Sequence, residues 1–293
     1  MAQEAARVSE SEAMIVWRMN GAGNAFVLID RRGEGGSAAP EEAAVRAIAD
    51  RHRFDQLLAL EDDPGADARL RVWNRDGSEV GACGNGTRAA AWLIFDEDGR
   101  ESLTLSSLGG ALRARRKPGG QAEVDLGPAR LDWREIPLAR ESATDRLDFE
   151  VALPEGGVLK DPGAVSMGNP HVVFFVKSVD AVPIEAIGPK IETDPLFPEK
   201  ANVGFAEIRS PEDIRLKVWE RGAGLTLACG TGAAAALVAA NRRGLAAREA
   251  VIEADGGRLP VRWTKDGHVH LAGPVELEGR LDLPEDLLAA FAG

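Results

Sequence analysis

Two cysteines are the residues of this chain best suited to acid–base chemistry, and each lies in the same short motif. Cys83 stands in ACGNGT (residues 82–87) and Cys229 in ACGTGA (residues 228–233), and the sequence holds no third cysteine. The glycines that follow each cysteine allow a tight turn and leave the N–H groups of a helix start uncovered. Those N–H groups and the helix dipole favour a bound carboxylate and also stabilise a thiolate.

The two motifs belong to a repeat that runs through the chain. Residues 69–90 align without gaps with residues 215–236, an offset of 146 residues. Four further matches follow in order at nearly the same offset: Gly23-Asn24 with Gly168-Asn169, Gln56 with Asn202, Gly109-Gly110 with Gly256-Gly257, and Gly127-Pro128 with Gly273-Pro274. The offset is half the chain length, so the sequence predicts a duplicated unit whose copies are related by a pseudo-twofold axis.

Both copies show the same order of expected elements. Each opens with strand-like runs and a short helix, which in the first copy covers residues 40–52 and begins with Pro40 and two glutamates. The Ala-rich stretches after the cysteine motifs, residues 87–95 and 233–244, are apolar on nearly all sides and predict buried helices. Alternating strands punctuated by glycine follow in both copies. We therefore expect the α+β class, with a mostly antiparallel sheet around one buried helix in each half.

Composition and charge exclude several classes of protein. The net charge is −12 with both signs interspersed, which argues against a nucleic-acid or membrane partner. The densest basic run, residues 113–117, is typical of the exposed side of a hairpin. No apolar run approaches the roughly 20 residues that span a bilayer, and the acidic residues 1–13 predict a flexible extension rather than a signal peptide. The chain is therefore expected in the cytoplasm, where thiols stay reduced.

Three structural or binding roles compete with acid–base chemistry for the cysteines. A single cysteine at a helix start is more often a small buried hydrophobe, and two close thiols can form a disulfide. Metal binding is disfavoured, because the four histidines are scattered: His52, His171, His268 and His270. If the halves face each other, however, both thiols lie on opposite sides of one bound α-carbon. One thiolate then removes the α-proton and the other thiol protonates the opposite face, which inverts the centre.

The chain resembles the diaminopimelate epimerase family from about Met14 to its end. The motifs that carry the resemblance are GAGNAF (21–26), FDQLL (54–58), WNRDGSEV (73–80), ACGNGTR (82–88), SMGNPH (166–171), NVGF (202–205), WERGAG (219–224) and ACGTG (228–232). The resemblance implies a barrel-like sheet in each half and an isomerase that interconverts LL- and meso-diaminopimelate without cofactor or metal. It also implies a first domain of residues 14–128 plus 275–293, a second domain of residues 129–274, and a homodimer.

The resemblance also implies roles for individual residues. Cys83 and Cys229 would be the two acid–base residues, and His171 and Glu220 would tune and orient the reacting groups. The α-carboxylate would be held by the backbone of Gly84, Asn85, Gly230 and Thr231, with Glu220 beside the α-ammonium group. Asn24 and Gln56 would line the site. The distal head group of the substrate would be bound by Asn74, Asn169, Asn202 and Arg221, although Asn74 and Asn169 are also typical turn residues.

Two departures and three alternatives accompany this interpretation. Ala25 stands where the family usually has an acidic residue, and the segment before Phe54 lacks the glycines often found there. Racemases of proline or hydroxyproline resemble the same architecture, but they typically carry histidine at the position of Asn85. Isomerases of the phenazine pathway lack the cysteine pair. A non-enzymatic amino-acid-binding protein would retain the distal amides and Arg221 without needing both thiols.

Overall fold

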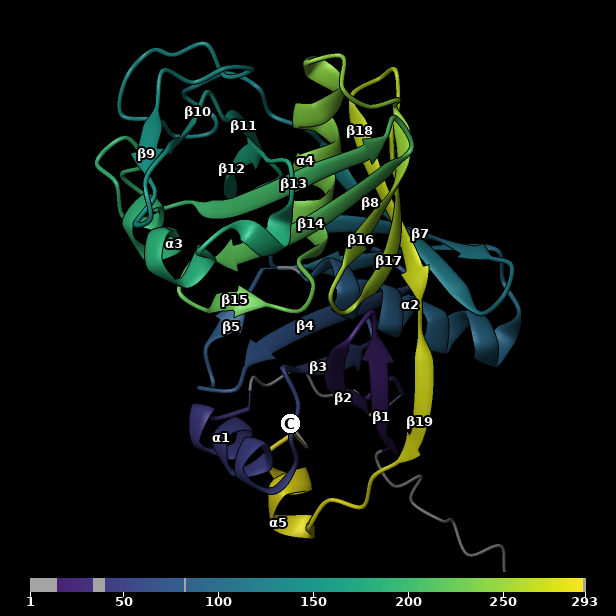
Figure 1. Cartoon of the computed structure of the whole chain (residues 1–293). Helices are drawn as coiled ribbons and strands as arrows, with labels where there is room; N and C mark the ends of the chain where they lie inside the picture. Colours follow the sequence, from purple (N-terminus) through teal and green to yellow (C-terminus); the bar gives the residue numbers. More distant parts are fainter. Residues whose placement is uncertain (1–14, 34–39, 82, 292–293) are drawn as a thin grey trace, which may run out of the picture.

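The computed structural model describes residues 15–33, 40–81 and 83–291, so the extension expected over residues 1–13 lies outside the described residues. Two halves lie one above the other in Figure 1, with the first half below and the second half above. The first half contains β1 (Ile15–Gly21), β2 (Asn24–Asp30), α1 (Glu42–Arg51), β3 (Gln56–Glu61), β4 (Ala68–Asn74), β5 (Glu79–Val80), α2 (Gly84–Asp98), β6 (Ser102–Ser107), β7 (Gly110–Lys117) and β8 (Gln121–Pro128).

The second half repeats this order of elements. It contains β11 (Gly163–Ser166), β12 (Pro170–Phe175), α3 (Ile184–Glu192), β13 (Asn202–Ser210), β14 (Asp213–Glu220), β15 (Gly224–Thr226), α4 (Gly230–Arg242), β16 (Glu249–Ala254), β17 (Gly257–Trp263) and β18 (His268–Pro274). Strand pairing repeats as well: β2 with β3 and β4 with β6 are parallel, as are β12 with β13 and β14 with β16. The remaining pairs in both halves are antiparallel, as expected from the sequence.

The two Ala-rich helices form the centre of the halves. In α4, every residue from Gly232 to Ala240 is buried, and in α2 the buried run extends from Asn85 to Ala91. Alanine side chains are small enough for strands to pack closely on all sides of each helix, and alanine has the highest helix propensity. Both helices belong to one large apolar cluster with the strands around them. The prediction of one buried helix in each half is confirmed.

The halves are joined by an antiparallel ladder between β8 and β18. Asp125 pairs with His270, and Val124 pairs with Leu271. In the repeat, the position equivalent to Asp125 is Leu271 and the position equivalent to Val124 is His270. The repeat therefore maps the first of these pairs onto the second. The pseudo-twofold axis therefore passes through this ladder. The pairing of its residues has the twofold symmetry that the repeat predicts for the two copies.

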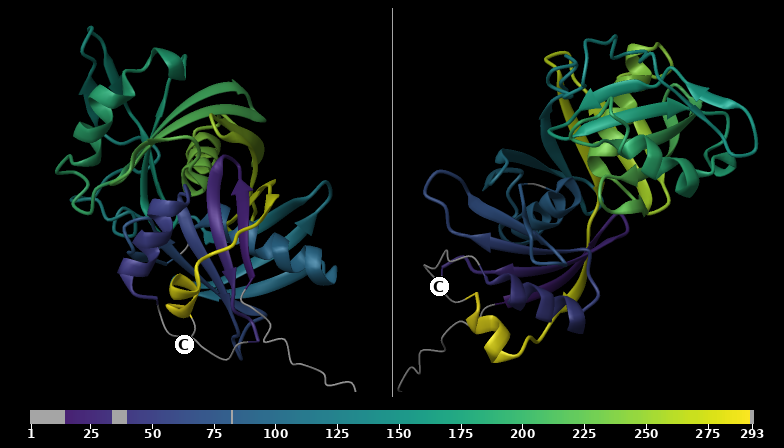
Figure 2. Two further views of the ribbon diagram at one scale, coloured as in Figure 1. Left: turned by 90° about the horizontal axis from the view of Figure 1, so that it is seen from below. Right: turned by 90° about the vertical axis from the view of Figure 1, so that its left-hand side faces the viewer.

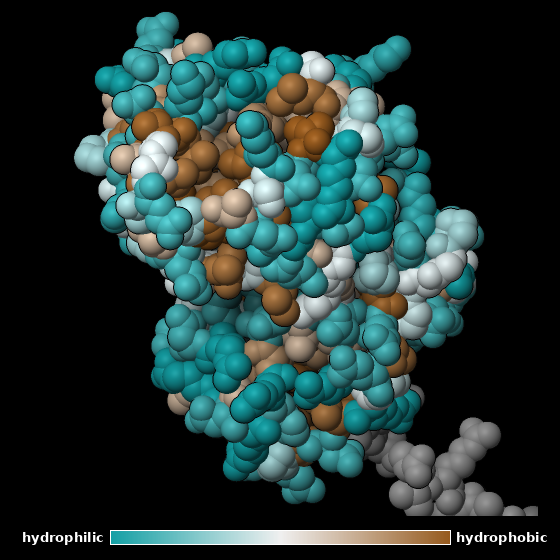
Figure 3. Space-filling view, viewed as in Figure 1, coloured by the Kyte–Doolittle hydropathy of each residue, from teal (hydrophilic) through white to brown (hydrophobic). Residues whose placement is uncertain are grey.

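The second half also contains elements whose equivalents at the offset of about 146 residues fall almost entirely outside the described residues. The hairpin of β9 (Glu150–Ala152) and β10 (Val158–Lys160) and the short helix η1 (Val179–Ala181) are examples. A second apolar cluster lies beneath this region and includes Phe174, Ile187 and Phe205. In Figure 3, apolar residues gather on the face of the second half, while the lower half is mostly hydrophilic. The basic run of residues 113–117 lies on the β7–β8 hairpin, where Arg113 and Arg115 are exposed as expected.

After β18 the chain crosses back to the first half, as Figure 2 shows in yellow. Strand β19 (Glu276–Arg280) pairs antiparallel with β1, and helix α5 (Glu285–Ala289) follows it. Leu287 and Phe291 join the apolar cluster that holds Ile48 of α1, and Phe291 packs edge-on against Trp73. The last segment of the chain thus covers the outer side of the first half.

Candidate active site

Cys83 and Cys229 are the N-cap residues of α2 and α4, and their local geometries match. Each has an extended backbone. Each sulfur accepts a hydrogen bond at 3.4 Å from the backbone N–H of the third residue after it, Gly86 or Gly232. A side chain that caps a helix start in this way lies beside the positive end of the helix dipole. Both cysteines are free thiols.

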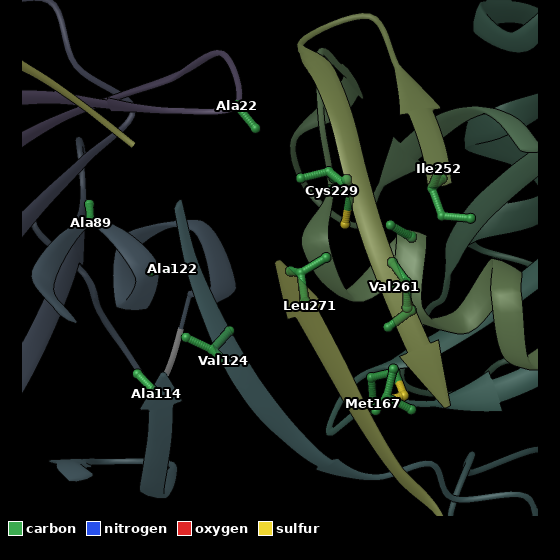
Figure 4. Packing of buried hydrophobic residues seen from close by; sticks show 14 of the residues in the cluster. Ala22, Ala89, Ala114, Ala122, Val124, Met167, Cys229, Ile252, Val261 and Leu271 are labelled. Atoms are coloured by element: carbon green, nitrogen blue, oxygen red, sulfur yellow. The ribbon is translucent and has the colours of Figure 1, made fainter. Parts of the chain in front are cut away.

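The two helix starts meet at the pseudo-twofold axis. A Cβ atom at Gly230 would lie 2.8 Å from Cδ2 of Leu271 and 3.4 Å from Oδ1 of Asn85, and one at Gly84 would lie 3.3 Å from the same Leu271 atom. Leu271 on β18 thus separates the first turns of α2 and α4, and Figure 4 shows it below Cys229. The Oδ1 atom of Asn85 is buried and has no hydrogen-bond partner among the described residues.

Cys229 is buried and Cys83 is partly buried, and the pKa of both thiols is raised. Burial is the largest cause for each, and the carboxylate of Glu220 adds to it by disfavouring a second negative charge nearby. Backbone N–H groups oppose this shift: those of Gly86 and Asn85 lower the pKa of Cys83, and that of Gly232 lowers the pKa of Cys229. The charge of Glu220 thus raises the pKa of both thiols, which lie at the two helix starts that meet at Leu271.

His171 is connected to Cys229 through Thr231. Its Nε2 atom lies 3.1 Å from Oγ1 of Thr231 and 3.1 Å from Oδ1 of Asn169, and the Thr231 hydroxyl lies 3.6 Å from the Cys229 sulfur. The histidine is almost fully buried, and burial together with the charge of Arg221 lowers its pKa to about 3. His171 is therefore neutral at neutral pH and orients the hydroxyl that reaches Cys229.

Glu220, at the end of β14, accepts a short hydrogen bond from Thr226. The hydroxyl of Thr226 on β15 donates to its Oε1 at 2.6 Å, and strands β14 and β15 pair directly at this point. This bond fixes the carboxylate while leaving it close enough to both sulfurs to influence their pKa. A carboxylate held in this way suits a cationic group of a bound molecule, because the two charges attract.

In the first half, three polar residues line up next to the Cys83 motif. Nδ2 of Asn85 donates to Oδ1 of Asn24. Asp55 in turn accepts from Nδ2 of Asn24 at 3.4 Å and from the backbone N–H of Ala25 at 2.9 Å. The position of Ala25 therefore contributes only its N–H to this group, and Asp55 supplies the nearby carboxylate.

The amides expected at the distal end of the site are paired within each half. Nε2 of Gln56 donates to Oδ1 of Asn74 at 3.3 Å, and Asn74 also accepts a turn hydrogen bond from Gly77 N at 3.0 Å. Asn202 is buried between Pro170 O and the backbone N–H of Arg221. These bonds fix the amides of each half, and the structure shows the turn role of Asn74 together with its contact with Gln56.

Three residues of this region were not expected from the sequence. Asp55 and Thr226 hold the expected residues Asn24 and Glu220, and Arg88 lies fully buried on α2. The adjacency of Asp55 to Gln56 in the FDQLL motif was a usable signal. Nothing in the sequence distinguished Thr226 from a surface strand residue or Arg88 from an ordinary helix former.

Residues 15–33, 40–81 and 83–291 contain neither a metal-binding cluster nor a membrane-spanning helix. No group of three or more His, Cys, Asp or Glu side chains in this part of the chain is placed to hold a metal ion. His268, one of the scattered histidines, instead contacts the carboxylate of Asp125 at 2.9 Å. Within the same residues, every helix is too short or too polar to cross a bilayer.

Comparison with known sequences points to one family. The sequence model of the family described as diaminopimelate epimerase matches residues 16–131 and residues 163–278, one match in each half. A diaminopimelate epimerase of Phenylobacterium zucineum is 51% identical over 270 residues, covering 91% of this chain and 96% of the relative. One of Acidiphilium cryptum is 53% identical over 270 residues, covering 90% of this chain and 95% of the relative.

Solved structures with low sequence identity share the fold. An epimerase of Pseudomonas aeruginosa, described as predicted, superposes with a TM-score of 0.66 at 22% identity, covering 92% of this chain and 99% of that chain. A hydroxyproline epimerase of Agrobacterium vitis with bound trans-4-hydroxy-L-proline gives 0.66 at 14% identity, covering 92% and 90%. The expected architecture of two similar halves is thereby confirmed.

Proposed function

Because the chain belongs to the diaminopimelate epimerase family, we propose that it is an isomerase that interconverts LL- and meso-2,6-diaminopimelate with its two thiols. This proposal is supported by the matched pair of N-cap cysteines at two helix starts that meet at Leu271, where Glu220 raises the pKa of both thiols. Inversion of a carbon centre needs a base on one face and an acid on the other. Two thiols related by a pseudo-twofold axis supply both.

The proton transfer follows from the placement of the two sulfurs. The thiolate of one cysteine takes the α-proton, the α-carbon passes through a planar carbanion, and the other thiol donates its proton to the opposite face. Cys83 and Cys229 exchange roles for the reverse reaction. Burial of Cys229 and partial burial of Cys83 limit the access of water that would protonate the carbanion on the wrong face.

The helix starts bind the group that makes the α-proton acidic. The N–H groups of Gly84, Asn85, Gly230 and Thr231 belong to the first turns of α2 and α4, which leave such donors without intrahelical partners. They would hold the α-carboxylate and stabilise the charge that spreads onto it in the carbanion. Glu220 would pair with the α-ammonium group, while Asn24 and Asn85 would line the same side.

The distal head group would contact the polar residues farther from the sulfurs. Gln56 and Asn74 in the first half, and Asn169, Asn202 and Arg221 in the second, are the groups proposed for this contact. Neutral amides and one guanidinium suit a zwitterion, because the guanidinium can bind its carboxylate in bidentate fashion. This requirement separates diaminopimelate from proline, which has no distal head group.

Incubation with LL-diaminopimelate in heavy water under reducing conditions tests the proposal. We expect meso product with deuterium at the inverted α-carbon, detected by proton NMR and mass spectrometry without added cofactor or metal. The same incubation with L-proline serves as the control for substrate class. A folded, reduced sample that incorporates no deuterium from LL-diaminopimelate refutes the proposal, and exchange of proline instead selects the racemase alternative.

We also propose cytoplasmic location, a homodimer, and a division into residues 14–128 plus 275–293 and residues 129–274. Both described thiols are free, and the mechanism requires reduced thiols, which the cytoplasm maintains. The pairing of β19 with β1 supports assignment of the last segment to the first domain. Sedimentation of the purified chain tests the dimer, and a monomer at working concentration would contradict it.

A further inference from the structure

Arg88 is a buried cation without a hydrogen-bond acceptor. It lies on α2, five residues after Cys83, and its side chain is 0% exposed. Within the described part of the chain, Nε and both terminal nitrogens of its guanidinium have no hydrogen-bond partner. A charge taken out of water is costly unless a counter-charge or hydrogen bonds replace the lost hydration. The guanidinium therefore needs an anion inside the protein.

The strands packed on α2 do not supply a carboxylate. Gly273 lies directly against the guanidinium, since a Cβ atom there would be 3.0 Å from one of its nitrogens. Gly273 pairs with Ala122, and paired residues of an antiparallel ladder point to the same face of the sheet. The titratable side chains of the ladder alternate to the other face: Glu123, Asp125, His268 and His270.

The carboxylates on the described strands around α2 have partners of their own. Glu123 is paired with Lys117 and Arg262, Asp125 with His268, Asp30 with Arg32, Glu61 with Arg31, and Arg18 with Glu278. Burial lowers the pKa of Arg88 to about 10, and the group whose negative charge opposes this shift is Cys83. Arg88 remains protonated at neutral pH, and its charge favours the ionised form of Cys83, the N-cap residue of the same helix.

The second half lacks this cation. At the offset of 146 residues, Ala234 takes the place of Arg88. The pKa of Cys229 is raised by burial and by Glu220, and the groups that lower it are the hydroxyl of Thr231 and the N–H of Gly232, both neutral. The pKa of Cys83 is raised by burial and Glu220 too, but Arg88 acts against the increase. The two thiols therefore differ by one buried positive charge.

We propose that Arg88 is a positioning residue that keeps Cys83, rather than Cys229, as the thiolate of the resting enzyme. The inference rests on the proposed function, in which one thiol must start ionised and the other protonated. The Cys83 thiolate takes the α-proton, the Cys229 thiol donates its own, and the negative charge then lies on Cys229. Transfer of a proton from Cys83 to Cys229 through solvent restores the resting state, because the charge returns to the side of Arg88.

Titration of each thiol by itself tests this proposal. In a Cys229→Ala background, ultraviolet absorbance of the thiolate against pH gives the midpoint of Cys83, and a Cys83→Ala background gives that of Cys229. We expect the Cys83 midpoint to be the lower one. Arg88→Met should raise it by about one pH unit, a tenfold loss of thiolate below the midpoint, and leave Cys229 nearly unchanged. Arg88→Lys should retain most of the charge effect.

Arg242→Met is the matched control, because Arg242 is a half-buried arginine at the far end of α4 with acceptors in Ala164 and Thr144. It should leave both midpoints in place. Equal shifts of both thiols in Arg88→Met, or no shift of Cys83, would overturn the proposal. If Arg88→Met does not fold, Arg88→Gln and Arg88→Lys give the same comparison. The titration needs no substrate, so its outcome is separate from that of the deuterium experiment.

Discussion

Around Cys83 the equivalent positions of the repeat are occupied by Phe26, Asn85 and Arg88, and around Cys229 by His171, Thr231 and Ala234. Both thiols have the same N-cap geometry, so the backbone of the repeat has been retained. The side chains have not. One thiol faces a buried cation, and the other faces a neutral hydroxyl held by a neutral imidazole. The backbone around the two thiols is thus symmetric, while the side chains around them differ. This difference suits a substrate carbon that is approached by a base on one side and an acid on the other.

The largest expected effect comes from removing either thiol. Cys83→Ala and Cys229→Ala should each lower the rate of epimerisation by about a thousandfold or more, because general acid or base catalysis contributes about 10²–10⁴. The measurement is kcat for LL- and for meso-diaminopimelate, followed by chiral separation of the products. Circular dichroism shows whether each variant is folded. Full epimerase activity in either folded single variant would contradict the use of two thiols.

The next effect separates the two halves by their acid sensitivity. His171, at the position that Phe26 occupies in the first half, has a pKa of about 3 in the folded protein and about 6.5 in the unfolded chain. Below about pH 6.5 only the unfolded chain binds this proton, so the free energy of unfolding falls as pH drops. His171→Gln should therefore remove about 2 kcal/mol of the stability difference between pH 7 and pH 5. Urea unfolding at both pH values measures it.

His52→Gln provides the control for that experiment, because His52 lies in the loop after α1, away from the central helices. The difference in unfolding free energy between pH 7 and pH 5 should be the same for this variant as for the unaltered chain. If His171→Gln is also no different from the unaltered chain, the histidine is not held neutral by burial, and its proposed role in orienting Thr231 loses its basis.

The smallest expected effect is the difference in stability loss between glycine variants at the hairpin tips of the two halves. Gly23 and its equivalent Gly168 both have positive φ, +84° and +91°. A Cβ atom at Gly23 would lie 2.8 Å from Cα of Gly256 in the opposite half, while one at Gly168 would meet nothing within 4 Å. Both Gly→Ala variants carry backbone strain of about 1 kcal/mol, but Gly23→Ala should cost about 1–2 kcal/mol more because of the overlap. Thermal unfolding of the two variants measures this difference. Equal losses of stability would show that the backbone at Gly256 moves to accept the added methyl group without a measurable cost.

Much of the fold follows from the sequence, because the signals are local and appear twice. The Ala-rich runs predict buried helices, the glycines after Cys83 and Cys229 predict N-caps, and the constant offset predicts two similar halves. The β8–β18 ladder did not follow, because strand partners between halves depend on contacts distant in sequence. The hydrogen bond between Gln56 and Asn74 was not predicted for the same reason. The burial of Arg88 was not predicted, because the exposure of a helix residue depends on which strands pack against the helix.

The register of the β8–β18 ladder has a consequence for the ancestry of the chain. An antiparallel pair of identical strands maps onto itself under a twofold rotation, so two identical single-unit chains can associate through the same ladder as a symmetric dimer. In such a dimer a substitution beside one thiol would appear beside both. A single chain that carries both units is free of that constraint, and the difference between Arg88 and Ala234 is of this kind.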